Sequence, residues 1–197
     1  MVTIRRLQKA DEIELCEKLP IANRLWGTDN EMICYGQMGY LPEREWIVKL
    51  TACEEEPRAT YTQNDEPVYK DSALEVFLNF APMADWYMNL EVNANGALLC
   101  HFGRKGEREP VVKRSTYRAS VFVQRAEHEW SVLLRIPVGL INDCFGDVKL
   151  EPGAEVRFNM YKISETEEIL HFISYTDIPV EKPDFHLPQY FAQGIMG

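Results

Sequence analysis

The 197-residue sequence predicts an all-β fold, an antiparallel β-sandwich with at most short helices. Two observations lead to this prediction. Apolar and polar residues alternate along several short segments, and turns rich in Gly, Pro, Asn and Asp separate those segments. Helical periodicity is weak, and its best example is the stretch "ADEIELCEKL" at residues 10–19. Short strands without intervening helices are typical of two packed antiparallel sheets.

The predicted strands follow one another through the sequence at residues 43–55, 72–80, 86–96, 97–102, 117–126, 129–137, 154–164 and 168–178. The longest turns between them are "FGRKGEREP" at residues 102–110 and "NDCFGDVKLEPGAE" at residues 142–155. The sequence contains no internal repeat and no linker rich in Pro, Gly or Ser. We therefore expect one domain that spans residues 1–197.

The strand at residues 72–80 has two chemically different faces. One face carries Leu74, Val76, Leu78 and Phe80, and the opposite face carries Glu75, Phe77 and Asn79. Along residues 86–96, Glu91 shares a face with Asn89 and Asn93. If the two strands are neighbours, their carboxylates and amides form one patch that suits a ligand rich in hydroxyl groups. The alternative is the ordinary solvated side of an antiparallel sheet.

The charge of the chain argues against some partners. It has 31 acidic and 21 basic residues and a net charge of −10. Binding to nucleic acid or to an anionic membrane depends on clustered Lys and Arg, so neither is expected. The five scattered cysteines predict free, buried thiols, and the charged N-terminal stretch predicts no signal peptide. We expect a cytoplasmic protein, or an extracellular or periplasmic one if a leader has been removed.

Motifs for catalysis or metal binding are absent from the sequence. The four histidines show neither H-x-H nor H-E-x-x-H spacing, and there is no G-x-S-x-G and no phosphate-binding glycine loop. No cofactor is therefore expected, although calcium can bind scattered carboxylates and carbonyls without a motif. Glu75 and Glu91 on adjacent strands could also act as the acid and base of a glycoside hydrolase.

Two aromatic residues lie in segments predicted to be loops. Tyr69 directly precedes the strand at residues 72–80, and Phe185 lies in the C-terminal stretch "EKPDFHLPQYF" at residues 181–191. Aromatic rings on loops at the edge of a sandwich can stack on the apolar face of a sugar ring. The two prolines of the C-terminal stretch restrict its backbone and hold it rigid without helix or sheet. Ordinary packing beneath a loop is the alternative for each aromatic residue.

Six segments together resemble family 9 carbohydrate-binding modules and their bacterial single-domain relatives. They are "VYKDSALEVFLNF", "YMNLEVNANGALL", "WSVLLRIPVGLI", "VRFNMYKI", "HFISYTDI" and "KPDFHLPQYF", in the order found in that family. The resemblance spans roughly residues 46–196. It implies a β-sandwich of the jelly-roll or immunoglobulin-like kind that binds sugars without cleaving them.

The resemblance also implies roles for individual residues. In the family, one aromatic residue before the "DS-x-x-E-x-F" strand and another in the tail hold the sugar between them; these positions are Tyr69 and Phe185 here. The polar contacts would come from Glu75, Glu91, Asn159 in "RFNMY" and, after "EEEP", Arg58. Well-studied modules commonly have Trp at both stacking positions, and sugar-binding members have a basic residue at the position of Glu91.

The sequence therefore predicts a protein that binds a mono- or oligosaccharide and does not cleave it. Two other functions stay open at this point. One is a carbohydrate-active hydrolase that uses Glu75 and Glu91, and the other is a structural or protein-interaction sandwich with an apolar open face. The sequence predicts neither the identity of the sugar nor the oligomeric state.

Overall fold

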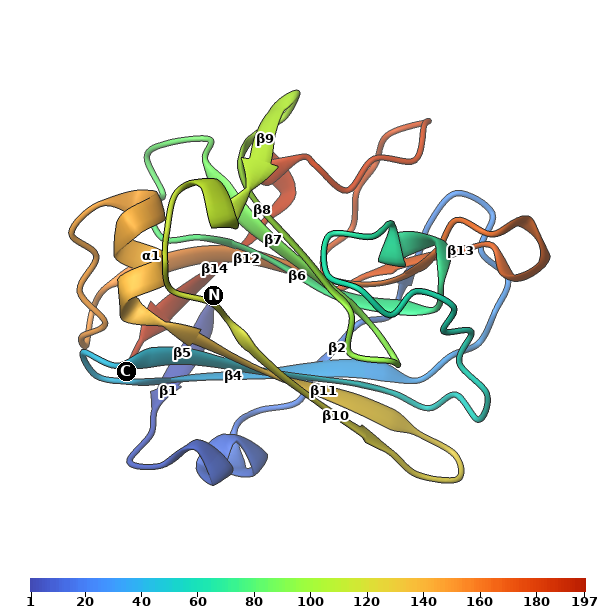
Figure 1. The fold of residues 1–197 in the computed structure, drawn as a ribbon, viewed down its shortest axis with the longest axis horizontal. Helices are drawn as coiled ribbons and strands as arrows, with labels where there is room; N and C mark the ends of the chain where they lie inside the picture. The colour runs from blue at the N-terminus through green and yellow to red at the C-terminus, as the bar shows by residue number, and fades with distance from the viewer.

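The computed structural model describes all 197 residues and arranges the strands in two layers (Figure 1). The first layer is here called the site sheet. In spatial order it contains β14 (Ala192–Met196), β12 (Glu155–Ser164), β6 (Ala73–Asn79), β7 (Tyr87–Asn93), β8 (Leu98–Arg104) and β9 (Glu107–Pro110). Two further strands extend it, β13 (His171–Ser174) beside β12 and β3 (Asn23–Arg24) beside β13. The second, the back sheet, contains β10 (Ser120–Arg125), β11 (Trp130–Pro137), β5 (Glu45–Ala52) and β4 (Cys34–Leu41), with β2 (Leu19–Pro20) beside β4. The predicted all-β sandwich is confirmed.

One strand joins the two sheets at an edge. The first half of β1 (Val2–Arg6) pairs with β14 of the site sheet, and its last two residues pair with β4 of the back sheet. Both of these pairings are parallel, whereas every other strand pairing is antiparallel. The sequence analysis predicted neither β1 nor the parallel pairings.

The main core lies between the sheets and follows the predicted alternation. Trp46, Val48 and Leu50 of β5 face Leu74 and Val76 of β6 across the core, and all five are fully buried. Burying such side chains contributes about 1.5–3 kcal/mol each, so this layer is the main source of stability. All five cysteines are free thiols.

β4 was missing from the predicted strands because it contains two glycines and little alternation. Gly36 lies directly beneath the side chain of Met160 on the opposite sheet. A Cβ atom at residue 36 would lie 2.2 Å from Met160 Sδ and 3.0 Å from Leu50 Cδ2, so glycine lets these two side chains pack here without moving. The same feature that weakens the strand pattern in the sequence therefore serves the packing of the sandwich.

Helices are short, as predicted. The stretch at residues 10–19 forms a 3₁₀ helix, η1 (Ala10–Leu15), and the other 3₁₀ turns are η2 (Val68–Lys70), η3 (Val111–Lys113), η4 (Glu167–Ile169) and η5 (Pro188–Tyr190). The α-helix α1 (Val138–Phe145) occupies part of the segment that was interpreted as a turn, at one end of the sandwich (Figure 1). It buries Leu140 and Ile141. None of these helices is long and apolar enough to span a membrane.

The outer face of the site sheet is not solvated, and that alternative from the sequence analysis is wrong. A second cluster of buried side chains covers it, formed by Leu25, Ala73, Phe77, Tyr87, Tyr161, Ile163, Phe172, Ile178, Phe185, Leu187 and Phe191. These side chains come from β6, β7, β12 and β13, from the N-terminal loop, and from the C-terminal tail. The tail therefore lies over the sheet and encloses the polar side chains beside it.

Candidate functional site

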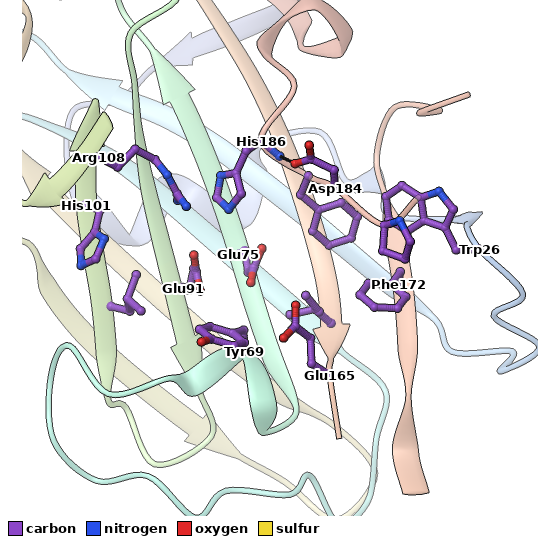
Figure 2. A pocket seen from close by; sticks show the side chains of 14 residues that line it. Trp26, Tyr69, Glu75, Glu91, His101, Arg108, Glu165, Phe172, Asp184 and His186 are labelled. Atoms are coloured by element: carbon purple, nitrogen blue, oxygen red, sulfur yellow. Dashed lines mark hydrogen bonds between the residues drawn. The ribbon is translucent and has the colours of Figure 1, made fainter. Parts of the chain in front are cut away.

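A cavity of about 420 Å³ opens beside this second cluster, on the outer face of the site sheet. Figure 2 shows Glu75 and Glu91 side by side in the middle, with Tyr69 and Glu165 on one side and His186 and Arg108 on the other. The complete lining is Trp26, Tyr69, Glu75, Glu91, Leu99, His101, Arg108, Ile163, Glu165, Phe172, Pro183, Asp184, Phe185 and His186. The volume lies within the usual range for a small-molecule site.

The floor of the cavity carries two carboxyl groups from neighbouring strands. Glu75 of β6 and Glu91 of β7 are direct cross-strand partners. Partners of this kind have Cβ atoms about 4.5–5.5 Å apart and point to the same face. Glu75 is 2% and Glu91 4% exposed, so both are removed from bulk water. The prediction that these two strands are neighbours is confirmed, and their pairing brings the two acids together.

Glu91 is only partly satisfied by hydrogen bonds within the protein. Its Oε1 accepts a hydrogen bond from Asn89 Nδ2 at 2.9 Å, whereas its Oε2 is buried without a partner. An unsatisfied buried acceptor costs about 1–3 kcal/mol. Glu91 lines the cavity, so its carboxyl group is an acceptor that a ligand entering the cavity would meet.

Burial and mutual proximity make both carboxyl groups hard to ionise. Burial is the main cause that raises the pKa of Glu75 well above its ordinary value, and the neighbouring Glu91 and Glu165 raise it further. Burial also raises the pKa of Glu91, to about 7, although the Arg108 guanidinium and the Asn89 hydrogen bond lower it. Two adjacent buried carboxylates repel each other, so the empty site favours a state in which at least one is protonated.

Arg108 is the one basic residue of the lining and reaches the cavity from the short edge strand β9. Its Nη1 donates a hydrogen bond to Asn89 Oδ1 at 3.2 Å, so Asn89 connects the guanidinium to Glu91. The β8–β9 hairpin positions Arg108, because Gly103 pairs with it and has a φ of 151°. A Cβ atom on Gly103 would lie 2.2 Å from the Glu107 carbonyl oxygen, so a side chain here would force β9 away.

The tail provides one wall of the cavity, as the sequence predicted, although most of its aromatic surface packs against protein. Phe185 is 5% exposed, and its ring stacks on Tyr161 with centroids 4.0 Å apart. Tyr161 also donates a hydrogen bond from its hydroxyl to the Phe185 carbonyl oxygen at 3.1 Å. One face of Phe185 is therefore occupied, and a ligand can reach only the remainder of the ring.

His186 also lines the cavity, beside Phe185 rather than on the far side of the tail. Its ring stacks on Phe77 at 4.9 Å between centroids, and its Nδ1 lies 3.1 Å from the Tyr87 hydroxyl. Burial first, and then the charge of Arg108, lowers the pKa of His186 to about 3. A neutral histidine in this position anchors the tail to the sheet.

The aromatic wall contains a residue that the sequence analysis missed, Trp26. It lies edge-on to Phe172 and tilted against Phe185, in each case with centroids 5.4 Å apart. Its Nε1 donates a hydrogen bond to the Val180 carbonyl oxygen at 2.7 Å, and its φ of 48° turns the chain toward the cavity. The only sequence signal was an aromatic residue directly before a glycine in a loop, outside the segments that resembled the family.

The structure brings together four of the six predicted site residues, which are Tyr69, Glu75, Glu91 and Phe185. Asn159 is fully buried on β12, where its Oδ1 accepts hydrogen bonds from the backbone amides of Met160 and Thr176. It does not line the cavity. Arg58 also lies outside the lining, and its Nε is 3.5 Å from Asp71 Oδ1. The missed lining residues are Trp26, Leu99, His101, Arg108, Ile163, Glu165, Phe172, Pro183, Asp184 and His186.

The cavity resembles a site for a small polar ligand more than a metal centre. No group of three or more His, Cys, Asp or Glu side chains is arranged to hold a metal ion. The combination of flat aromatic side chains and buried acceptors instead suits a molecule with one apolar face and several hydroxyl groups.

A family model described as carbohydrate-binding family 9 matches residues 37–196. The chain belongs to carbohydrate-binding family 9. All the cavity residues except Trp26 lie inside the matched range. The predicted family is therefore confirmed over most of the chain. No curated protein sequence matches this family 9 chain.

Solved structures of similar fold agree with this assignment. A candidate carbohydrate-binding protein from Bacteroides uniformis is 19% identical with a TM-score of 0.82, and the alignment covers 100% of this chain and 98% of the other. A family 9 module from Caldicellulosiruptor kristjanssonii in complex with cellotriose is 11% identical with a TM-score of 0.71, covering 99% and 92%. The same kind of module in complex with glucose is 12% identical with a TM-score of 0.71, covering 100% and 95%. At these identities the similarity shows a shared fold.

Proposed function

We propose that the cavity binds one ring of a mono- or oligosaccharide and does not cleave it. The observation that carries this proposal is the pair of buried carboxyl groups, one with an unpartnered oxygen, at the floor of a cavity with aromatic walls. Sugar hydroxyl groups would donate hydrogen bonds to Glu75 and Glu91. The apolar face of the ring would lie against Tyr69, Trp26 or the free part of Phe185.

The relatives support a saccharide as the ligand. The chain belongs to a carbohydrate-binding family, and two structures of the same fold contain cellotriose and glucose. The cavity volume of about 420 Å³ suits a single sugar ring with part of a neighbour.

The arrangement of the two acids favours binding over hydrolysis. Glycoside hydrolases place their two carboxyl groups on either side of the scissile bond. Here both groups come from adjacent strands and point from the same floor. Incubation with activated aryl glycosides should therefore give no turnover. Turnover that Glu75→Gln abolishes would instead establish the hydrolase alternative.

Isothermal titration calorimetry with glucose, cellotriose and other mono- and oligosaccharides tests the proposal. We expect saturable binding of at least one sugar by the wild type. Tyr69→Ala should lower the affinity about tenfold or more, because an aromatic contact of this kind contributes roughly 0.5–1.5 kcal/mol beyond its buried area. The fold should persist, because Tyr69 is only partly buried.

Two further variants make the result specific. Phe185→Ala should lower both sugar affinity and stability, because this ring is packed on Tyr161. Tyr117→Ala is the matched control, since Tyr117 is 52% exposed and lies outside the cavity. Sugar affinity that is the same in the wild type, Tyr69→Ala and Phe185→Ala would remove the cavity from the proposed function.

A further inference from the structure

The charged groups of the cavity are not balanced. Four carboxyl groups and only one permanently basic side chain line it. Asp184 is already neutralised, because its carboxylate forms an ion pair with Lys105 outside the cavity. Glu165 is exposed to solvent and has the positive charge of Lys70 nearby. That leaves Glu75 and Glu91 against the single guanidinium of Arg108. The two histidines of the lining do not change this balance, because burial lowers the pKa of both.

Arg108 forms no direct hydrogen bond to either of the two remaining acids. Its Nη1 donates a hydrogen bond to Asn89 Oδ1, and Asn89 Nδ2 in turn donates one to Glu91 Oε1. The second oxygen of Glu91 stays without a partner although the residue is 96% buried. The protein therefore holds an unpartnered carboxyl oxygen beside a second buried carboxyl group, which can satisfy it only when that second group is protonated.

A hydroxyl group and an ammonium group would satisfy this oxygen differently. A hydroxyl donates one hydrogen bond and brings no charge. A primary ammonium donates three hydrogen bonds and brings a positive charge, so it can contact both Glu75 and Glu91 and remove their repulsion. The aromatic side chains nearby add attraction, because the face of Trp or Tyr attracts a cation within about 6 Å.

We propose that this cavity selects a sugar that carries a free, protonated amino group over the neutral sugar of the same size. The amino group would lie between Glu75 and Glu91, and the ring would lie against the aromatic wall. This inference rests on the proposed function and adds the ligand class. An N-acetyl group removes the charge and two of the donors, so the acetylated sugar loses the advantage.

Calorimetric titration of the full chain with glucosamine, glucose and N-acetylglucosamine at about pH 7 tests this inference. We expect glucosamine to bind about tenfold tighter than glucose or more, since hydrogen bonds to charged groups are roughly twice as strong as neutral ones. N-Acetylglucosamine should bind no tighter than glucose. Ethylammonium alone should bind far more weakly than glucosamine, because it has no ring to stack.

Two charge-removing variants and one control locate the effect. Glu91→Gln and Glu75→Gln should each lower the ratio of glucosamine to glucose affinity several-fold, whatever happens to the affinity for glucose itself. Glu127→Gln removes the same charge from the β10–β11 turn, where the side chain is 87% exposed, and should leave the ratio unchanged. Circular dichroism confirms that each variant is folded.

The possible outcomes separate this inference from the proposed function. Glucose that binds as tightly as glucosamine would overturn the inference and leave sugar binding in place. Ethylammonium that binds as tightly as glucosamine would also overturn it, because the sugar ring would then contribute nothing. If no sugar binds saturably to the wild type, the proposed function itself fails.

Discussion

The two faces of the site sheet differ in whether their buried charged groups are paired. On the inner face, between the sheets, Lys162 is fully buried and contacts Glu54 at 3.4 Å and His171 Nε2 at 2.8 Å. Ser72 and Trp130 donate hydrogen bonds to the Glu54 carboxylate, and Lys162 donates one to the Ser72 hydroxyl. These five residues, here called the inner cluster, satisfy one another. On the outer face, Glu75 and Glu91 have no such counterion in direct contact.

The pKa values reflect this difference. Burial alone would raise the pKa of Glu54, but the Lys162 ammonium and the hydrogen bonds of the inner cluster outweigh it and hold the pKa low. For Glu75 and Glu91, burial dominates and the pKa of each is raised. Adjacent residues of β12, Ile163 and Lys162, thus face the ligand cavity and the inner cluster, respectively. On this sheet the charged groups of the inner cluster are paired with one another, whereas the two carboxyl groups on the cavity floor have no counterion in contact.

The largest expected effect comes from the inner cluster. Lys162→Met leaves Glu54 without its counterion and should lower the free energy of unfolding by about 3–5 kcal/mol. Chemical denaturation measures this change. Lys149→Met is the control, because Lys149 is 61% exposed and pairs only with Asp147 on the surface. A loss below about 1 kcal/mol in Lys162→Met would contradict the structural role of the inner cluster.

Removing the charge of Glu91 from the outer face should raise the free energy of unfolding, whereas removing that of Lys162 lowers it. The folded-state pKa of Glu91 is about 7, above its ordinary value of 4.5, so the folded protein binds more protons than the unfolded chain between these values. The stability that Glu91 contributes is therefore complete below about pH 4.5 and is lost as the pH rises through 7. Glutamine does not titrate. Glu91→Gln should gain stability relative to the wild type over this pH range, on the order of 3 kcal/mol in total.

The measurement is the difference in Tm between Glu91→Gln and the wild type as a function of pH. Taking the difference removes the opposing contributions of His171 and His186, whose pKa values are lowered to about 4 and about 3. Glu127→Gln should give a difference that does not change with pH. A difference that is flat for Glu91→Gln as well would show that this carboxyl group is not hard to ionise.

A smaller effect is expected where the outer face meets the ligand. Trp26→Leu keeps an apolar side chain against Phe172 but removes the flat ring, so sugar affinity should fall about tenfold, or about 1.4 kcal/mol. The free energy of unfolding should fall by less in Trp26→Leu than in Lys162→Met. Calorimetry and denaturation of the same preparation compare the two quantities. A Trp26→Leu variant with full sugar affinity would place the ring outside the binding site.

The smallest effect is expected for Arg58. Its Nε lies 3.5 Å from Asp71 Oδ1, and the arginine side chain is about half exposed. Asp71 is buried, but its other oxygen accepts hydrogen bonds from the Thr60 and Tyr61 backbone amides and from Asn93 Nδ2, so the pair should contribute only roughly 0–1 kcal/mol. Arg58→Ala should therefore change stability by less than about 1 kcal/mol and leave sugar affinity unchanged. A tenfold loss of affinity would mean that Arg58 reaches the ligand, as the sequence analysis predicted.

Local patterns in the sequence were sufficient for most strands and for the floor of the site. Alternation along residues 72–80 and 86–96 predicted that Glu75 and Glu91 share a face, and their cross-strand pairing confirms it. The family resemblance added Tyr69 and Phe185, which both line the cavity. These features depend on strand period and short-range order, which a single sequence displays.

The remaining features depend on contacts between distant segments. Trp26 reaches the cavity because its loop packs on Phe172 and Val180, about 150 residues further along the chain. Arg108 reaches it because β9 pairs with β8 at the edge of the site sheet. Burial of the outer face requires the tail to lie across it, which alternation along single strands cannot predict. For the same reason Asn159, which has a suitable side chain, was predicted for a site that it does not line.

The most direct test of sugar binding on the outer face is a crystal structure of the chain with the sugar that binds most tightly in calorimetry. We expect one sugar ring in the cavity, with hydroxyl or amino groups within hydrogen-bond distance of Glu75 and Glu91. We also expect an aromatic contact to Tyr69 or Trp26. A sugar bound elsewhere, for example over the exposed face of the back sheet, with the cavity carboxylates not contacting it, would contradict the account.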